Sequence, residues 1–241
     1  MFCRKKLKQF DEQKKYFYAW NMNKIILKKN HFTIRNATKA DLDDLMRVEQ
    51  MWPPDQRASA DQFLSRLEIF PEGFWVGEYD HTIVGLSTSC LQHYHPDDLT
   101  QFHSWNSATN NGYLYPKIND PNALNVVSTV IVKEFRGKGL LQAFIEKHKE
   151  MTGKLGLAYS LTGAMLPGYD AYCRKYGEIS AYQYAILRHQ NRLVDPLIRS
   201  LDSGGYKLPD ERHVMPNYFQ SSESRNYAAL LVYHNRTMAR S

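Results

Sequence analysis

Hydrophobic and polar residues alternate along several stretches of this chain, with the period of two that is typical of strands. Two such stretches flank a turn at Asp80-His81, which predicts a β-hairpin. The pattern predicts about seven strands: Phe32–Arg35, Phe74–Tyr79, Thr82–Cys90, Leu124–Val132, Gly156–Ala164, Tyr206–Val214 and Tyr227–Tyr233. The last two are expected to form an antiparallel pair.

Apolar residues spaced three and four apart predict helices between these strands. The first helix contains Leu42, Leu45, Met46, Val48 and Glu49, and it ends before Pro53-Pro54 because proline cannot continue a helix. Further helices are expected at Ser59–Ile69, Gln142–Met151, Ile179–His189 and Asp195–Leu201.

Two segments lack a clear period. Residues 91–121 are polar and aromatic and are expected to form an inserted loop, with one short helix near Leu99–Ser104. Leu166–Gly177 is expected to be an irregular loop. The order of the elements predicts an α+β fold, α/β-like, with a mixed central sheet and helices packed on both faces.

The segment Asn125–Leu141 carries the clearest chemical signal. A buried strand runs into the basic glycine turn Arg136-Gly-Lys-Gly139, and the turn opens an amphipathic helix. Such a junction points free backbone N–H groups and the positive end of the helix dipole at one spot. The sequence therefore predicts a site for a phosphate or pyrophosphate group.

Several protein classes are disfavoured by composition. No apolar run reaches the roughly 18 residues that a membrane helix needs, and the N-terminus lacks the apolar core of a secretion signal. Cys3, Cys90 and Cys173 lie far apart, with neither metal-ligand spacing nor a disulfide framework. We therefore expect no metal, no transmembrane segment and a cytoplasmic location.

The net charge of +6 is concentrated at one end of the chain. Residues 1–30 hold nine lysines and arginines against Asp11 and Glu12, so the remaining residues are close to neutral. We expect a basic N-terminal extension at 1–30 and one domain at 31–241, with no nucleic-acid partner for that domain. The extension is interpreted as a solvated tail, as sequence upstream of a start at Met22, or as a segment that binds an acidic surface.

The Arg136-Gly-Lys-Gly139 turn between a buried strand and a helix resembles the acyl-CoA motif of the GNAT superfamily of N-acetyltransferases, Arg/Gln-x-x-Gly-x-Gly/Ala. Arg136 and Gly139 match this motif, and Leu141 departs from its small last residue. The resemblance covers about residues 31–234 and implies the GNAT fold. The chain also resembles a GNAT subgroup that is sometimes fused to carbon–nitrogen hydrolase domains. This likeness lies in Pro167-Gly-Tyr169, Asp195-Pro196, Gly205-Tyr206, Met215-Pro-Asn-Tyr218 and Asn226-Tyr-Ala-Ala229.

The resemblance implies acetyl-CoA as the acyl donor. Its pyrophosphate would be held, mainly by backbone N–H groups, at Arg136, Gly137, Lys138, Gly139, Leu140 and Leu141. Its pantetheine arm would pair like an added strand with the backbone of Val130, Ile131 and Val132. A backbone N–H near Val130 would meet the thioester oxygen.

The general acid is not assigned by the resemblance. Many family members place a tyrosine five residues before the aromatic residue of a Gly-aromatic pair, here Gly205-Tyr206, and that position holds Leu201. A shift of one residue offers Ser200 or Asp202 instead. Other candidates are three tyrosines of the loop after the preceding strand, which are otherwise interpreted as loop packing: Tyr169, Tyr172 and Tyr176.

The general base is also open. The family often has a carboxylate near the start of the central strand, where this chain has Asn125, Ser128 and Thr129. His93 and His95 are candidates because histidine titrates near neutrality, although solvent-facing loop histidines fit the same pattern.

These observations predict an enzyme, an N-acetyltransferase that moves an acetyl or other short acyl group from acetyl-CoA to the amine of an unidentified acceptor. Two alternatives remain: a non-catalytic acyl-CoA-binding module, and an interaction protein that docks through its basic tail. The sequence leaves open whether the chain forms a homodimer. A triphosphate site is disfavoured because the longer Gly-x-x-x-x-Gly-Lys-Ser/Thr loop is missing.

Overall fold

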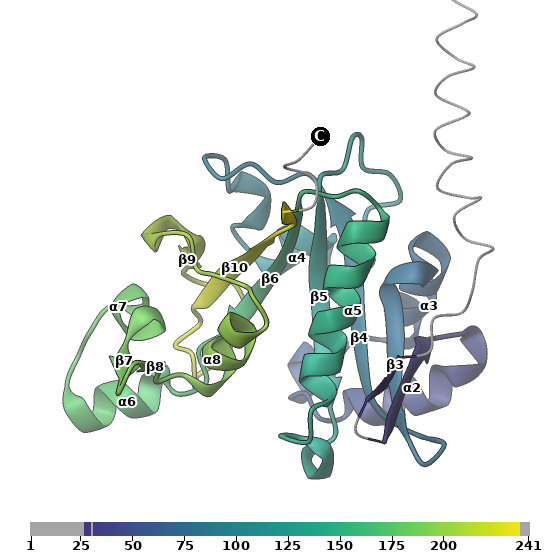
Figure 1. Ribbon diagram of the computed structural model, residues 1–241, viewed down its shortest axis with the longest axis horizontal. Coiled ribbons are helices and arrows are strands. Elements are labelled where there is room, and N and C mark those ends of the chain that lie inside the picture. The colour runs from purple at the N-terminus through teal and green to yellow at the C-terminus, as the bar shows by residue number, and fades with distance from the viewer. Residues whose placement is uncertain (1–26, 30, 237–241) are drawn as a thin grey trace, which may run out of the picture.

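The structure is a computed structural model that describes residues 27–29 and 31–236. Eight strands of this part form one mixed sheet in the order β1-β2-β3-β4-β5-β6-β10-β9, in which only β5 and β6 are parallel neighbours (Figure 1). The strands are β1 (Leu27–Lys29), β2 (Phe32–Asn36), β3 (Phe74–Tyr79), β4 (Thr82–Gln92), β5 (Ala123–Ile131), β6 (Tyr159–Met165), β9 (Val214–Met215) and β10 (Ala228–His234).

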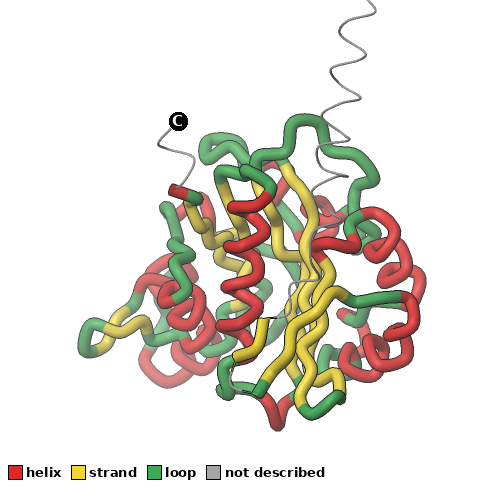
Figure 2. The backbone as a smooth tube through the Cα atoms, turned by 45° about the vertical axis from the view of Figure 1, so that its right-hand side comes forward, coloured by secondary structure: helices red, strands yellow, loops and turns green. Residues whose placement is uncertain are grey.

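Helices cover both sides of this sheet, as Figure 2 shows. They are α2 (Leu42–Glu49), α3 (Ala60–Ile69), α4 (Trp105–Thr109), α5 (Leu140–Lys154), α6 (Tyr169–Tyr176), α7 (Ala181–Ile186) and α8 (Pro196–Ser203). The predicted α+β architecture, with a mixed sheet of about seven strands and helices on both faces, is confirmed. Within the described residues, no helix is long and apolar enough to cross a membrane.

The sheet begins earlier in the chain than predicted. Leu27–Lys29, which we assigned to the N-terminal extension, form β1 and pair antiparallel with β2. Residues 1–26 and residue 30 lie outside the described part of the chain, as do residues 237–241.

The predicted strand Tyr206–Val214 is wrong for most of its length. Lys207 makes a single bridge to Val232, and pairing resumes only at β9. Pro209 has no N–H to donate to a ladder, and the side chain of Asp210 caps a short 3-10 helix at Glu211–His213 instead.

The segment Leu166–Gly177 is not an irregular loop, because it contains α6. Tyr169 and Cys173, four residues apart, are both buried on one face of this helix. Gly177, with φ +101°, ends it.

The helix predicted at Ile179–His189 ends at Ile186. A small hairpin follows, in which β7 (Arg188–His189) pairs with β8 (Arg192–Leu193). Gln190 and Asn191 turn this hairpin with positive φ angles, a conformation that asparagine tolerates.

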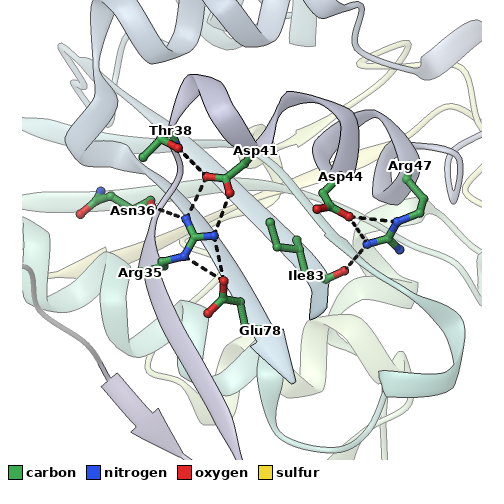
Figure 3. Close-up of polar contacts among 8 residues, drawn as sticks. All are labelled: Arg35, Asn36, Thr38, Asp41, Asp44, Arg47, Glu78 and Ile83. Carbon is green, nitrogen blue, oxygen red and sulfur yellow. Dashed lines mark hydrogen bonds and ion pairs between the residues drawn. The ribbon is translucent and has the colours of Figure 1, made fainter. Parts of the chain in front are cut away.

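Polar contacts fasten α2 to the sheet at two points (Figure 3). At its start, the guanidinium of Arg35 on β2 binds the carboxylates of Asp41 and Glu78, at 2.8 Å each. Further along, Arg47 donates a 2.8 Å hydrogen bond to the carbonyl oxygen of Ile83. These contacts fix the direction of α2, and its last residue, Glu49, is consequently buried.

The start of α5 is fixed by close packing. The side chain of Leu140 occupies space that the glycines of β3 and β4 leave open, since a Cβ on Gly77 or Gly85 would come within 3 Å of it. The helix that follows the glycine turn is thereby held directly against the sheet.

Candidate functional site

Strands β5 and β6 run side by side for only part of their lengths. Their parallel pairing covers Ala123–Val126 of β5 and Tyr159–Thr162 of β6, and it stops there. Val127–Ile131 of β5 therefore have no partner on β6, although β5 lies in the middle of the sheet. We call these two unpaired strand ends the β5–β6 split.

The split begins at a bulge in β5. Thr88 of β4 pairs with Ser128 and Ser89 pairs with Val126, so Val127 is an extra residue opposite β4. The indole Nε1 of Trp105, on α4, donates a 2.8 Å hydrogen bond to the carbonyl oxygen of Val127. The segment predicted as an inserted loop therefore covers the sheet at this point.

The glycine turn follows the open end of β5, as predicted. Gly137 and Gly139 have φ angles of +73° and +96°, which glycine adopts without strain. Arg136 is exposed, and its Nε donates a 3.1 Å hydrogen bond to the carbonyl oxygen of Ile131. The ammonium of Lys138, also exposed, lies 5.1 Å from the ring centre of Phe135.

Backbone donors are available where the turn meets α5. Gly139 is the N-cap of this helix, and the first N–H groups of a helix have no partner within it. The side chain of Leu140 is 1% exposed and packs in the core, so only the backbone of this residue is placed to bind a ligand. Leu141 is half-buried beside the cluster around α8.

Two charged side chains are buried on the face of the sheet that α2 and α3 cover. Glu49 is 2% exposed and Arg66 is 1% exposed. Burial raises the pKa of Glu49 to about 7 and lowers the pKa of Arg66 to about 10. In both cases the cost of burial exceeds the attraction between the two groups.

A second buried polar cluster lies on the opposite face, under α5. The Nε2 atom of His148 is 2.9 Å from the hydroxyl of Ser87, which is in turn 2.8 Å from the hydroxyl of Thr129 on β5. Burial lowers the pKa of His148 to about 3, so this histidine is neutral at physiological pH.

Tyr218 lies against β6 where the split begins. A Cβ on Gly163 would come within 2.6 Å of its ring, so only glycine leaves room for it. Tyr218 is 4% exposed, and burial raises the pKa of its phenol. Its hydroxyl has no hydrogen bond within the described residues.

The three tyrosines that we named as candidate acids lie on α6. The hydroxyl of Tyr169 donates a 2.8 Å hydrogen bond to the carbonyl oxygen of Ile179. Tyr172 packs against the rings of Tyr176 and Tyr184, and Tyr176 is 64% exposed. In Figure 1, α6 and α7 lie beyond α8, on the side away from β5.

His93 and His95 lie beyond the paired end of β5, since the neighbouring Gln92 pairs with Ala123. They line an open hollow of about 550 Å³ together with Tyr115 and other residues of the 91–121 segment. The structure therefore places both histidines at the end of β5 opposite the split.

The positions aligned with the family's tyrosine lie on α8. Leu201 is buried in a hydrophobic cluster, Ser200 donates to the carbonyl oxygen of Pro196, and Asp202 pairs with Lys207. None of these contacts leads to β5.

Glu49 and Arg66 were missed by the sequence analysis as functional candidates. Both occur within predicted amphipathic helices, where a charged residue at an apolar position of the helical period was the available signal. The Nη1 of Arg66 lies 3.5 Å from the hydroxyl of Thr88, and Thr88 pairs with Ser128 at the start of the split.

Searches among known proteins found clear relatives, although no family model matches the chain. The uncharacterized N-acetyltransferase YkwB of Bacillus subtilis is 31% identical over 208 residues, which cover 84% of this chain and 88% of the relative. The probable hydrolase YhcX of the same organism is 26% identical over 208 residues. That match covers 84% of this chain but only 38% of YhcX, which confirms the resemblance to hydrolase-fused domains.

Solved structures agree in fold. The loading GNATL domain of CurA from Lyngbya majuscula superposes with a TM-score of 0.68 at 19% identity, over 84% of this chain and 97% of that domain. The GphF GNAT-like decarboxylase, solved in complex with isobutyryl-CoA, gives a TM-score of 0.67 at 19% identity, over 83% of this chain and 98% of that protein.

Proposed function

This chain belongs to the GNAT superfamily, and we propose that it is an N-acyltransferase that moves an acetyl or short acyl group from acyl-CoA to an amine. The β5–β6 split beside the Arg136–Gly139 turn is the observation that carries the proposal. It leaves an open strand edge that ends at a set of free backbone donors. YkwB, named an N-acetyltransferase, supports this class of reaction, and the complex of GphF with isobutyryl-CoA supports an acyl-CoA ligand.

The donor is proposed to bind in two parts. The backbone of Ile131 would pair with the pantetheine arm. The predicted pairing at Val132 and Val130 is not available in this arrangement, because the N–H of Val132 donates a 2.9 Å hydrogen bond to the carbonyl oxygen of Val84 and Val130, two residues earlier, faces β4 in the same way. The exposed Arg136 and Lys138, with the N–H groups that follow them, would hold the pyrophosphate. Leu140 contributes only its N–H, because its side chain is in the core.

Glu49 is proposed as the base. Its pKa of about 7 leaves a substantial fraction ionised at neutral pH, and it senses the charge of Arg66, whose Nη1 lies 3.5 Å from the hydroxyl of Thr88 at the start of the split. Tyr218 is proposed as the acid, because it is a buried neutral phenol without a hydrogen-bond partner among the described residues.

The reaction then balances as follows. The acceptor enters as an ammonium ion and gives one proton to Glu49. Its nitrogen bonds to the thioester carbon, and the carbon–sulfur bond breaks. Tyr218 protonates the leaving sulfur, so that CoA departs as a thiol, and recovers a proton from the new amide nitrogen. Glu49 finally releases its proton to water.

Calorimetric titration with acetyl-CoA tests the donor site. We expect micromolar binding by the parent protein and its loss in Gly139→Glu, which places a carboxylate where the pyrophosphate would lie. Gly177→Glu is the matched control, since Gly177, at the end of α6, has a similar φ of +101° and an added side chain there meets open space. Unchanged binding by Gly139→Glu would exclude this site.

Release of CoA thiol in the presence of a panel of amines tests the reaction. Tyr218→Phe removes one oxygen atom and should lower kcat by roughly 100- to 10,000-fold while leaving acetyl-CoA affinity unchanged. A protein that binds acetyl-CoA but transfers to no amine would be a non-catalytic acyl-CoA-binding module.

A further inference from the structure

Glu49 and Arg66 each keep one polar atom without a partner. Glu49 accepts a 2.8 Å hydrogen bond from the N–H of Ala58 through Oε1, and its Oε2 has no partner. Arg66 donates a 2.8 Å hydrogen bond from Nε to the carbonyl oxygen of Gly112, and its Nη2 has no partner. Its Nη1 lies 3.5 Å from the hydroxyl of Thr88.

The two groups do not satisfy each other. Each responds to the charge of the other, but no ion pair within 4 Å joins these two described residues. A buried charge without a close partner is costly, and proteins seldom retain one except where it serves a ligand or a specific structure. The arrangement therefore offers a separated negative and positive group on one face of the sheet.

Arg66 links this face of the sheet to the start of the split. Arg66 reaches Thr88, Thr88 pairs with Ser128, and Ser128 is the first residue after the bulge at the split. Trp105 meets the same bulge from α4. Arg66 therefore lies beside the start of the split, and Glu49 lies within reach of its charge.

We propose that the acceptor is a zwitterion that carries a carboxylate close to its amine, as a free amino acid does. Its ammonium would bind Oε2 of Glu49, and its carboxylate would bind Nη2 of Arg66, the two atoms that have no partner. This inference rests on the proposed acyltransferase function and adds the chemical class of the acceptor to it.

Glu49 and Arg66 are covered by other parts of the protein, and this cover affects which acceptors can bind. Arg66 lies directly beneath Gly112, and the covering segment is tied to α3 by hydrogen bonds from Gln62 to the carbonyl oxygen of Asn111 and from Ser65 to that of Tyr113. Neither open atom has surface accessible to water. An acceptor must displace this cover, and once it is enclosed both of its charges would be matched away from water.

The test compares free amino acids with their amides as acceptors, with acetyl-CoA as the donor and the full chain as the enzyme. The amide keeps the amine and removes only the carboxylate charge. We expect kcat/KM for the best free amino acid to exceed that of its amide by about 100-fold. Arg66→Met should abolish this preference and leave the calorimetric affinity for acetyl-CoA unchanged.

Two further variants separate recognition from folding. Arg66→Lys keeps the positive charge and should retain part of the preference. Arg174→Met is the matched control, because Arg174 is exposed on α6, where it pairs with Asp170, and this variant should behave as the parent protein does. Independently of any variant, free amino acids should raise the Tm of the parent protein, and their amides should not.

Equal turnover of amino acids and amides, with normal acetyl-CoA binding, would overturn the inference and leave the acyltransferase function intact. Failure to bind acetyl-CoA, or to transfer to any amine, would overturn the function itself. A different outcome is that the protein releases carbon dioxide from malonyl-CoA in a reaction that requires Arg66. In that case the guanidinium binds a carboxylate on the acyl group, and the acceptor inference is wrong.

Discussion

The indole Nε1 of Trp105 donates a 2.8 Å hydrogen bond to the carbonyl oxygen of Val127, the extra residue of the bulge in β5. The bond joins the covering segment to the strand at the point where β5 loses its partner β6. A bulge leaves backbone groups outside the regular ladder, and this carbonyl is satisfied by a side chain from far along the chain.

Trp105→Phe is expected to destabilise the protein by about 1 to 3 kcal/mol, because the carbonyl oxygen of Val127 loses its donor. Urea denaturation at neutral pH measures the change. Trp52→Phe is the control, since Trp52 is half-buried against the cluster under α2 and its indole has no hydrogen bond within the described residues. An equal loss in both variants would mean that ring size, and not the hydrogen bond, matters.

Glu49 should make stability fall as the pH rises. Folding raises its pKa from 4.5 to about 7, so the folded chain holds the proton more tightly than the unfolded chain. Its contribution is fully present below pH 4.5 and is lost as the pH rises through 7, a difference of roughly 3 kcal/mol. Glu49→Gln should remove this slope from the free energy of unfolding measured between pH 4.5 and 8.

The neighbouring charges of Arg66 and Arg57 lower the pKa of Glu49 and therefore oppose the effect of burial. The slope of stability against pH reports the net result of these opposing effects. Glu134→Gln, at an exposed position, should leave the slope as it is. An unchanged slope in Glu49→Gln would show that Glu49 is ionised throughout this range.

His148 should act in the opposite direction, at acid pH. Its pKa falls from 6.5 to about 3 on folding because the ring is fully buried. Its contribution is complete above pH 6.5 and is lost as the pH falls toward 3, by up to about 5 kcal/mol. His148→Gln should make acid unfolding shallower, whereas the exposed His95→Gln should not change it. An acid limb identical to that of the parent protein would contradict this assignment.

Leu140→Ala should cost about 2 to 5 kcal/mol of stability, because the side chain fills the space left by Gly77 and Gly85. We also expect weaker acetyl-CoA binding in calorimetry, since the start of α5 loses its contact with the sheet. Leu141→Ala, at a half-buried position, should cost less stability. A larger loss for Leu141→Ala would show that α5 is fixed from the side of α8 instead.

Regular periodicity made most of the fold predictable. The strand, glycine turn and helix around Arg136 lie where the sequence places them, because local patterns of apolar residues and glycine determine each of these elements. Where a single residue outweighs the pattern, the prediction fails. Pro209 interrupts the strand expected at Tyr206–Val214, and the tyrosine-rich α6 hides its period among polar residues.

The candidate site was predictable only on the donor side. The donor residues are contiguous in the chain, so a sequence pattern can reveal them. Glu49 and Arg66 come from two helices, and their burial results from the way in which both helices lie on the sheet. The sequence alone does not show that two charged residues on separate amphipathic helices lie inward and near each other.

In the part of the chain that the structure describes, the split between β5 and β6 adds two inner strand edges to the two outer edges of the sheet. Within residues 27–29 and 31–236, the outer sides of β1 and β9 and the inner sides of Val127–Ile131 and Gly163–Met165 lack a ladder neighbour. The last five residues of β5 therefore behave as a boundary strand although they lie at the centre of the molecule. At the periphery of a protein, an open strand edge can pair with another polypeptide. Here the protein's own helices surround this edge, and the ligand that suits it is one that forms hydrogen bonds as a peptide does.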